Sequence, residues 1–560
     1  MAMTNMSASP STKRHASGFR AFPKGRQADA GALEEIRKVL NRRPRRADLL
    51  IEHLHLIQDR FGHISARHLV ALAEEMKLSQ AEVYEVATFY AHFDVIKEGR
   101  TPPPDLTVRV CDGISCALAG ADDLISTLKQ ALGDTIRVIP SPCIGACDTA
   151  PAAVVGKNRI GNADTGRIAA AVDARLTAPQ AVDYSGLEAY RRDGGYDVLN
   201  SCYAGERDRD GLLSEIEQAG LRGLGGAGFP VARKWRFMLD APKPRLMAIN
   251  ADEGEPGTFK DRHCLETDPH RVIEGALLAA WIIEADEIYI YLRDEYPQIR
   301  RILETEIANV EAAGLNNAVS IHLRRGAGAY ICGEESALLE SLEGKRGLPR
   351  NRPPYPAQSG LFARPTLINN VESLFWLRQI IEGSAEAYLT AGRPHFYSVS
   401  GRVKNPGVKL APAGITARQL IDDYAGGMAD GHTLKAYLPG GASGGILPAS
   451  LADLALDFGT LEKYGCFVGS AAVVVISDQD DITDVVLNLV RFFEDESCGQ
   501  CTPCRSGCEK LSQMLSAGDR NEGLIGDLAE TMREASICGL GQAAANPVMS
   551  ALRFLKDEMA

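Results

Sequence analysis

Residues 496–504 read Glu-Ser-Cys498-Gly-Gln-Cys501-Thr-Pro-Cys504, and a fourth cysteine, Cys538, follows further along the chain. Three cysteines in the spacing C-x2-C-x2-C with a remote fourth are a strong pattern for a [4Fe–4S] cluster. Three closely spaced thiolates can cap one face of the cube, and the remote thiolate closes it. The alternative is a zinc ion held by an unusual set of three neighbouring ligands and one distant ligand.

A second group of cysteines lies upstream, as Cys111-x4-Cys116 and Cys143-x3-Cys147. Each pair follows a segment with the pattern of a β-strand, so the two pairs can converge from adjacent loops. Four thiolates suit a [2Fe–2S] cluster or a zinc ion. Structural zinc pairs are usually spaced C-x2-C or nearly so, and the spacing here therefore favours the cluster. Four unrelated buried cysteines are the remaining alternative.

The chain contains 13 cysteines, an odd number, and it has no secretory signal, so a disulfide framework is a poor explanation for them. Cys508 lies about one helical turn after Cys504 and could compete as a ligand. We interpret it as a buried cysteine of a helix. The same interpretation, as small buried hydrophobic residues, applies to Cys202, Cys264, Cys332 and Cys466.

Composition and charge exclude several classes of protein. The chain has 560 residues, 45% of them hydrophobic and 24% charged, which is typical of a soluble protein with several domains. Its net charge of -12 disfavours sequence-independent binding to nucleic acid. No apolar stretch approaches the ~20 residues that span a bilayer. The first thirty residues carry five basic side chains and one acid, which predicts a flexible tail rather than a transit peptide, and we expect a cytoplasmic protein.

Hydrophobic periodicity gives the domain organisation. Apolar residues recur at helical spacing over 31–98 and again after about 480, whereas 106–180 reads strand, helix, strand, strand, as in a small thioredoxin-like domain. Capping boxes are predicted at Ser79 with Glu82 and at Thr416 with Gln419. We therefore expect a multidomain α/β protein with a flexible tail at 1–30, a helical domain at 31–105, a thioredoxin-like domain at 106–180, a linker at 181–205, an α/β domain at 206–390, a β-grasp (SLBB-like) domain at 391–475 and a helical domain at 476–560.

Residues 223–230, Gly-Leu-Gly-Gly-Ala-Gly-Phe-Pro, contain the motif G-x-G-x-x-G. A dinucleotide-binding fingerprint must follow a strand and open a helix. Here the preceding segment, 211–220, has the pattern of a helix, so we do not expect a Rossmann loop. Bare backbone amides can still approach a phosphate closely, and Lys234 adds a positive charge nearby. A tight loop between packed elements is the alternative.

Further polar loops follow in the same region. Residues 250–261 place several acids around glycine and proline after a strand-like run, as in a loop that lines a ligand, although a solvated acidic turn has the same composition. Residues 326–336 open a helix whose amino end is an anion site but carries two carboxylates. Residues 352–356 and 366–372 are weaker signals when each is taken alone.

Together these segments resemble a known family. Gly-Leu-Gly-Gly-Ala-Gly-Phe-Pro, Asn-Ala-Asp-Glu-Gly-Glu-Pro-Gly, Gly-Ala-Tyr-Ile-Cys-Gly-Glu-Glu, Ile-Asn-Asn-Val-Glu and Glu-Ser-Cys-Gly-Gln-Cys-Thr-Pro-Cys look like the flavin- and NADH-binding subunit of respiratory complex I. The first 180 residues, with Glu-Val-Tyr-Glu-Val-Ala-Thr-Phe-Tyr at 82–90, look like its [2Fe–2S] partner subunit. The fusion of the two is similar to the diaphorase (β) subunits of soluble NAD-dependent formate dehydrogenases and of some NAD-reducing hydrogenases.

The resemblance implies the cofactors FMN, NAD, [4Fe–4S] and [2Fe–2S], with FMN and NAD in the 206–390 domain. It implies that the clusters are held by Cys498, Cys501, Cys504 and Cys538 and by Cys111, Cys116, Cys143 and Cys147. It also implies the residues that bind FMN and the nicotinamide nucleotide, namely Gly223, Gly225, Gly226, Gly228, Phe229, Lys234, Asn250, Asp252, Glu253, Glu255, Tyr330, Gly333, Glu334, Glu335, Arg352, Tyr355, Asn369 and Asn370.

We assign catalytic roles to Glu253 and Glu335. Together with Glu255 they would repel the extra phosphate of NADP and so favour NAD. The resemblance implies an electron-transfer diaphorase whose separate catalytic subunit, a formate-oxidising chain with a molybdenum or tungsten pterin, exchanges electrons with NAD through this chain. The alternatives are a diaphorase subunit of an NAD-reducing hydrogenase or of a complex I-like NADH dehydrogenase, and, from another class, a zinc-bearing assembly scaffold.

Overall fold

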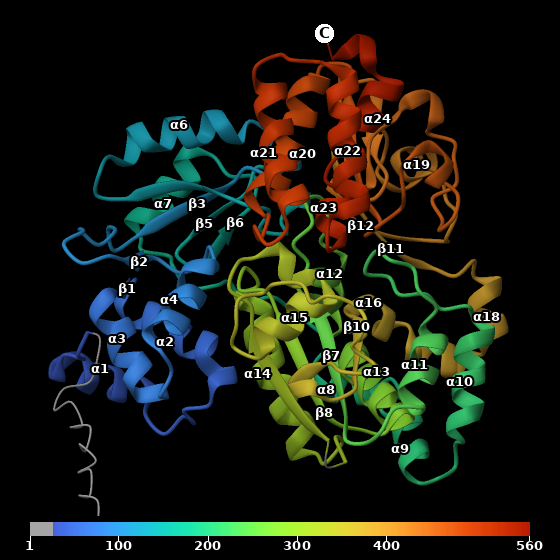
Figure 1. Ribbon diagram of the computed structural model, residues 1–560. Coiled ribbons are helices and arrows are strands. Elements are labelled where there is room, and N and C mark those ends of the chain that lie inside the picture. The colour runs from blue at the N-terminus through green and yellow to red at the C-terminus, as the bar shows by residue number, and fades with distance from the viewer. Residues whose placement is uncertain (1–25, 318, 560) are drawn as a thin grey trace, which may run out of the picture.

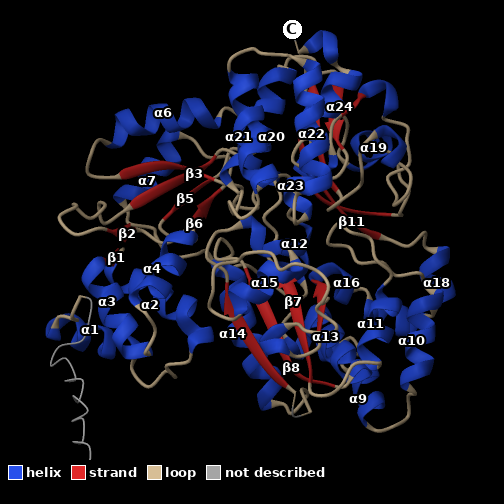
Figure 2. Cartoon of the chain, viewed as in Figure 1, coloured by secondary structure: helices blue, strands red, loops and turns tan. Residues whose placement is uncertain are grey.

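The computed structural model describes residues 26–317 and 319–559. Most of the expected flexible tail therefore lies outside the described residues. Figure 1 shows a blue helical domain and a cyan α/β domain on one side, a green and yellow α/β domain in the lower half, and an orange and red region above it. Figure 2 shows the strands gathered in separate parts of the molecule. The described residues form three larger sheets and one two-stranded ladder.

The amino-terminal domain is built from four helices, α1 (Ala30–Leu40), α2 (Leu50–Phe61), α3 (Ala66–Met76) and α4 (Gln80–Phe89). The predicted capping box is confirmed, since Ser79 Oγ accepts from the Glu82 N–H at 3.1 Å and the Glu82 carboxylate accepts from the Ser79 N–H at 2.8 Å. A short parallel ladder between β1 (Ile64–Ser65) and β2 (Val95–Ile96) was not predicted. Runs of two residues are too short to give a period.

The next domain has a sheet in the order β4-β3-β5-β6. Strands β3 (Thr107–Cys111) and β4 (Arg137–Ser141) are parallel, and β5 (Ala153–Val155) and β6 (Asn158–Ile160) complete the sheet in antiparallel pairs. Helices α5 (Ile114–Leu118), α6 (Ala121–Leu132) and α7 (Thr165–Asp173) accompany it. The predicted first strand of this domain is confirmed as β3, with Val108 and Val110 fully buried on one face. Cys111 is the last residue of β3 and Cys116 lies in α5, whereas Cys143 and Cys147 are in the segment that follows β4.

The central domain has a parallel sheet in the order β10-β7-β8-β9, with strands β7 (Arg245–Ala251), β8 (Ala285–Leu292), β9 (Ser320–Arg325) and β10 (Thr366–Asn370). Asn250 and Asn370 are register partners at the carboxyl ends of β7 and β10. Ligands of open parallel sheets bind at that edge. Helices surround the sheet: α10 (Arg209–Gln218), α11 (Val231–Leu239), α12 (Lys260–Thr267), α13 (Pro269–Ile283), α14 (Pro297–Ala312), α15 (Glu335–Leu342), α16 (Val371–Phe375), α17 (Leu377–Gly383) and α18 (Ala385–Thr390). The glycine loop joins α10 to α11, so the prediction that it is not a Rossmann loop is confirmed.

The third sheet has the order β12-β11-β15-β13-β14. Strands β11 (His395–Gly401) and β12 (Gly407–Ala411) form an antiparallel hairpin that turns at residues 402–406, and β13 (Leu434–Leu438), β14 (Leu447–Pro448) and β15 (Ala472–Ser477) complete the sheet. The capping box of Thr416 and Gln419 at α19 (Ala417–Gln419) is also confirmed.

The carboxyl-terminal region is helical, as predicted, with α20 (Ile482–Asp495), α21 (Thr502–Ser516), α22 (Glu522–Ala535), α23 (Gly539–Ala543) and α24 (Asn546–Phe554). Its predicted apolar stripe is buried at Ile482, Val485, Val486, Leu489 and Phe493. None of the described helices combines the length and the apolar character that crossing a membrane requires.

The segment 181–205, expected to be a linker, is instead ordered and helical. It contains α8 (Leu187–Arg192) and α9 (Asp197–Tyr203), and Tyr190 and Tyr196 are buried against the central domain. The Tyr190 hydroxyl donates to Glu274 at 2.6 Å, and the Tyr196 hydroxyl bonds to His270 Nδ1 at 2.8 Å. Both helices are too short to show a hydrophobic period in the sequence, and buried hydrogen bonds to distant residues hold them in place. No local sequence pattern therefore predicts that this segment is structured.

This buried network predicts the stability of the segment. We expect Tyr190→Phe to destabilise the central domain by about 1–3 kcal/mol, because the Glu274 carboxylate loses its donor in a buried position. Tyr190→Ala should cost about 3–5 kcal/mol, since it also leaves a cavity. Limited proteolysis within 181–205 and the thermal midpoint of the full chain measure both effects. Tyr84→Phe, at a ring that is 42% exposed, is the control. Equal proteolysis of Tyr190→Ala and the unaltered chain would contradict the assignment.

Candidate functional site

A cavity of about 330 Å³ lies at the carboxyl edge of the central sheet. Its size falls at the lower end of the range for small-molecule sites. Segments from the central domain, the third sheet region and the carboxyl-terminal helices form its walls. The lining residues are Gly225, Gly226, Ala227, Asn250, Asp252, Glu253, Gly254, Glu255, Thr258, Lys260, Asp261, Tyr330, Ile331, Gly333, Glu334, Asn370, Ser443, Phe467, Gly469, Ser470, Gly539, Leu540 and Ala543.

Ten of the residues expected to bind a cofactor line this cavity: Gly225, Gly226, Asn250, Asp252, Glu253, Glu255, Tyr330, Gly333, Glu334 and Asn370. Hydrogen bonds from Asn250 and Asn370 explain why these residues, which come from separate loops, lie together. Asn250 Nδ2 donates to the Gly333 carbonyl at 2.8 Å, and Asn370 Nδ2 donates to Asp261 Oδ2 at 2.6 Å. Register partners on neighbouring strands thus tie two separate loops to the sheet edge.

Glu253 lies in the cavity wall with only 6% of its surface exposed. Its carboxylate accepts from the backbone N–H groups of Asp261 and Arg262, at 2.8 and 3.0 Å, and from the Tyr296 hydroxyl at 2.9 Å. Burial, and then the nearby charge of Asp261, raise the pKa of Glu253 to about 7. The carboxylate therefore organises the acidic loop and is not free to act as a surface charge.

Glu255 connects three regions of the chain. One carboxylate oxygen accepts from the Ser443 N–H at 2.7 Å, and the other accepts from the Tyr330 hydroxyl at 2.8 Å. The Tyr330 N–H in turn donates to Glu496 at 2.9 Å, two residues before Cys498. A loop of the central domain is thereby held against both the third sheet region and the second cysteine group.

Two buried oxygens of the cavity residues, Asp252 Oδ2 and Glu334 Oε1, accept no hydrogen bond from the described residues, although Glu334 Oε1 lies 3.5 Å from the Arg352 guanidinium. Glu334 is the N-cap of α15, and its other oxygen accepts from the Ser336 and Ala337 N–H groups at 2.9 Å. The amino end of this helix, expected to be an anion site, is therefore filled by the chain's own carboxylate. Buried acceptors without donors fit a ligand that brings hydroxyl or ring N–H groups, as a ribityl flavin does.

The glycine loop supplies hydrogen-bond donors, in contrast to the carboxylate acceptors on the other walls of the cavity. Gly225 and Gly226 line the cavity with bare backbone, and a Cβ on Gly225 would lie 3.1 Å from Asn370 Cβ. Gly226 has φ of 128°, which favours glycine. Such a loop permits close approach of a phosphate to backbone amides. The cation in this wall, Lys260, is fully buried and pairs with Asp261 at 2.8 Å and Glu372 at 3.0 Å. The donors and acceptors present thus fit FMN.

Eight expected binding residues do not line the cavity: Gly223, Gly228, Phe229, Lys234, Glu335, Arg352, Tyr355 and Asn369. Glu335 pairs with Arg352 at 2.7 Å and with Lys234 at 3.4 Å, and Arg352 also approaches Glu334 at 3.5 Å, so this ion-pair group adjoins the cavity wall. Phe229 and Tyr355 are 42% and 54% exposed. Asn369 is buried next to Trp235.

The first cysteine group converges as predicted in geometry. Cys111, Cys116, Cys143 and Cys147 are all buried, and the sulfurs of Cys143 and Cys147 lie 3.4 Å apart. The thiols of Cys111 and Cys147 donate to Cys143, and with the positive charge of Arg293 they hold the pKa of Cys143 well below its usual range. The second pair packs against Phe259 in the acidic loop of the cavity. These thiols are therefore next to the cavity wall.

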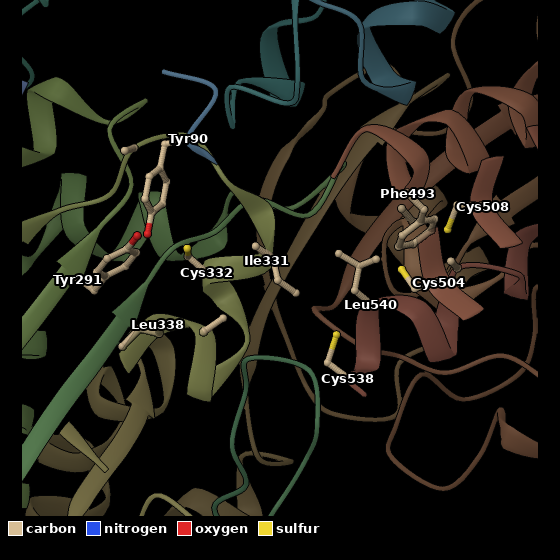
Figure 3. Close-up of a cluster of buried hydrophobic side chains, with 14 of the residues drawn as sticks. Tyr90, Tyr291, Ile331, Cys332, Leu338, Phe493, Cys504, Cys508, Cys538 and Leu540 are labelled. Atoms are coloured by element: carbon tan, nitrogen blue, oxygen red, sulfur yellow. The ribbon is translucent and has the colours of Figure 1, made fainter. Parts of the chain in front are cut away.

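The second cysteine group lies on the other side of the cavity. Cys538 is the residue that caps α23, and three residues of that helix, Gly539, Leu540 and Ala543, line the cavity. Figure 3 shows Leu540 between Ile331 of the central domain and Cys504. A Cβ on Gly541 would lie 2.7 Å from Cys504 Cβ, so α23 also packs closely on α21.

Cys508 is buried beside Cys504, as Figure 3 shows. A hydrogen bond from its thiol lowers the pKa of Cys504 to about 7, while the pKa of Cys508 itself is raised. A neutral Cys508 next to a thiolate Cys504 fits the interpretation of Cys508 as a packed neighbour of a ligand.

Within the described ranges, the one group of three or more histidine, cysteine or acidic side chains whose ligand atoms all lie within 4.8 Å is His55, His92 and Asp294. Asp294 there is already bound by His92 and Arg325, so the group joins domains as an ion-pair network. Neither cysteine group is this compact. A single zinc ion with Zn–S bonds of about 2.3 Å would need its sulfurs closer together, whereas an iron–sulfur cluster spans a wider set.

Several lining residues were missed: Gly254, Thr258, Lys260, Asp261, Ser443, Phe467, Gly469, Ser470, Gly539, Leu540 and Ala543, with Ala227 and Ile331 next to predicted positions. Lys260 and Asp261 were within the quoted acidic loop and could have been included. The residues after 440 carry no local motif for ligand binding. They reach the cavity only through tertiary packing.

Comparison with known proteins agrees with this division of the chain. Residues 216–379 match the family model described as the Nuo51 FMN-binding domain, residues 36–175 that of the thioredoxin-like [2Fe-2S] ferredoxin, and residues 484–560 that of the NADH-ubiquinone oxidoreductase-F iron-sulfur binding region. The glycine and acidic loops fall in the first region. Each cysteine group falls in one of the other two.

Curated relatives and solved structures extend the similarity. The chain is 41% identical over 392 residues to the F 2 subunit of the NADH-quinone oxidoreductase of Rhizobium meliloti (strain 1021), covering 66% of this chain and 93% of that protein. It is 39% identical over 391 residues to the corresponding F subunit of Aquifex aeolicus (strain VF5), covering 66% and 90%. A chain in the crystal structure of an NAD+-reducing [NiFe]-hydrogenase in the air-oxidized state is 33% identical, with a TM-score of 0.80, and the match covers 93% of this chain and 94% of that one.

The geometry of the second cysteine group predicts which substitutions remove iron. Cys501→Ala and Cys538→Ala should lower the iron content and the visible absorbance of the purified chain, because a thiolate lost from a set of four leaves one iron open. Cys508→Ala should retain both and serves as the matched control. Loss of the cluster in Cys508→Ala with retention in Cys538→Ala would show that the ligand assignment is wrong.

Proposed function

Since the chain belongs to the family of the FMN-binding F subunit of NADH-quinone oxidoreductase, preceded here by a thioredoxin-like [2Fe-2S] domain, we propose that it is the diaphorase subunit of a formate:NAD+ oxidoreductase. Family membership establishes the coarser part: the chain is an electron-transfer subunit that works with NAD(H), FMN, a [2Fe–2S] and a [4Fe–4S] cluster. The formate-oxidising partner is the proposal.

One observation supports the electron-transfer route most directly: the cavity contacts the segments that carry both cysteine groups. The acidic loop packs on Cys143 and Cys147 through Phe259, and α23, which begins after Cys538, forms another part of the wall. FMN exchanges two electrons with a nicotinamide and one with an iron–sulfur cluster. A ligand in this cavity is therefore adjacent to an exit on either side.

The residues of the chain take distinct parts in this proposal. The glycine loop and the oxygens of Asp252 and Glu334 that accept no hydrogen bond from the described residues bind the flavin, and Asn250 and Asn370 orient its surroundings. Glu253 and Glu255, held by buried hydrogen bonds, shape the cavity. The exposed aromatic rings of Phe229 and Tyr355 and the group of Lys234, Glu335 and Arg352 form the entrance used by the nicotinamide nucleotide.

The formate context rests on the fusion of the two modules in one chain, which is similar to diaphorase subunits of soluble NAD-dependent formate dehydrogenases. The partner would be a separate chain with a molybdenum or tungsten pterin. A second candidate is the diaphorase subunit of an NAD-reducing hydrogenase. It is favoured by the structural match that covers 93% of this chain.

Two carboxylates, Glu335 at the entrance and Glu255 in the cavity wall, predict the choice of nucleotide. Glu335 offsets the charges of Arg352 and Lys234. Glu335→Gln removes the carboxylate that pairs with Lys234 and leaves Arg352 with Glu334 at 3.5 Å, so both cations attract a 2′-phosphate more strongly. The use of NADPH relative to NADH should improve by about 1–2 kcal/mol, the scale of one unfavourable charge contact in a partly buried site. Glu255→Gln should act in the same direction.

Ratios of kcat/KM for the two nucleotides measure this preference. Glu386→Gln, which removes an exposed acid of α18, is the control for net charge. An unchanged preference in both the Glu335 and the Glu255 variant would remove the electrostatic explanation.

Adding partner subunits tests the proposed function. The purified chain with its cofactors should oxidise NADH with ferricyanide or a dye as acceptor, because that reaction needs only the cavity and a cluster. It should form no NADH from formate until a formate-oxidising subunit is added. Formate-dependent NADH formation by the single polypeptide would refute the proposal. If only a hydrogen-oxidising subunit activates the chain, the assignment as a diaphorase subunit stands, and hydrogen rather than formate is the electron donor of the complex.

A further inference from the structure

Arg293 is a buried cation at the contact between the cavity and the first cysteine group. It follows β8 directly and is 4% exposed. Its Nη2 donates to the Cys143 carbonyl at 2.6 Å, and its Nη1 donates to the Glu253 carbonyl. The guanidinium thus lies between the peptide of an iron ligand in one domain and the peptide of a cavity residue in another.

The loop that receives Arg293 is packed without free space. Gly145, between Cys143 and Cys147, has φ of 68°, and a Cβ there would lie 2.2 Å from the Tyr296 hydroxyl. The Arg262 guanidinium donates to the Gly145 carbonyl. Two arginines of the central domain therefore hold the same loop, and its thiolates have a fixed position relative to both charges.

The two arginines differ in how far their charge is neutralised. Arg262 pairs with Asp148 at 2.6 Å and with Glu266 at 3.3 Å. Arg293 has one ion-pair partner among the described residues, Glu295 at 3.2 Å, and that side chain is 26% exposed to solvent. A partly solvated carboxylate compensates a buried cation incompletely. Arg293 therefore contributes the larger net positive charge to the cluster loop.

We propose that Arg293 raises the reduction potential of the [2Fe–2S] cluster, although it belongs to a different domain from the cysteines, and so sets how readily electrons pass to that cluster from the cavity. Two ferric ions, two sulfides and four thiolates carry a charge of about 2−, and one-electron reduction makes it more negative. A nearby buried cation stabilises the reduced form more than the oxidised form. This inference needs the cofactors of the chain but not the formate-oxidising partner.

Charge-removing and charge-keeping variants of Arg293 test the proposal on the full chain with its cofactors. In a redox titration followed by electron paramagnetic resonance, Arg293→Gln should lower the equilibrium constant for cluster reduction at least tenfold, which is about 59 mV for one electron. Arg293→Lys should stay within about twofold of the unaltered chain. Lys157→Gln, at an exposed cation of the same domain as the cluster, is the control and should leave the potential unchanged.

A variant that should shift the reduction potential in the opposite direction keeps the test decisive if Arg293→Gln fails to load the cluster. Glu295→Gln removes the partial compensation of Arg293 and should raise the potential, whereas Glu304→Gln, an exposed acid of the following helix, should not. The potential of the [4Fe–4S] cluster should shift less than that of the [2Fe–2S] cluster in each of these variants, since Arg293 bonds directly to the loop of the first cysteine group. Equal shifts in Arg293→Lys and Arg293→Gln, or an unchanged or lowered potential in Glu295→Gln, would overturn the proposal and leave Arg293 as a purely structural clamp.

Discussion

The carboxylate of Glu253 is removed from water at the point where the cavity, the first cysteine group and helix α14 meet. It retains its position through two backbone N–H groups and the Tyr296 hydroxyl. A carboxylate buried without such donors would cost several kcal/mol. The acidic loop, the first turn of α12 and the residues before α14 must therefore adopt their observed positions together. The remaining contacts of the cavity wall form only when these three segments are in place.

The same acidic loop explains why the cavity and the first cysteine group lie next to each other. Glu253 and Glu255 face the cavity, and Phe259, a few residues on, packs against Cys143 and Cys147. Lys260 between two carboxylates fixes the loop to the interior of the central domain. Short-range electron transfer needs donor and acceptor at a constant separation. A loop anchored by buried ion pairs and hydrogen bonds provides it without any large movement.

The features that the sequence predicted correctly are local ones. The capping boxes at Ser79 and Thr416 and the strand that begins the 106–180 domain are each decided by a few neighbouring residues. Ser443 and Leu540 enter the cavity wall only because distant domains dock there, and no local pattern marks them. The segment 181–205 was misread as a linker for the same reason, since its order comes from buried contacts with residues far along the chain.

Helix α23 joins the second cysteine group to the cavity through a direct chain connection. Cys538 precedes the helix immediately, and Gly539, Leu540 and Ala543 of the helix form part of the cavity wall. Cys538 and the cavity wall are therefore neighbours in the chain itself, with no residue between them. A substitution that shifts this short helix acts on the second cysteine group and on the shape of the cavity at the same time.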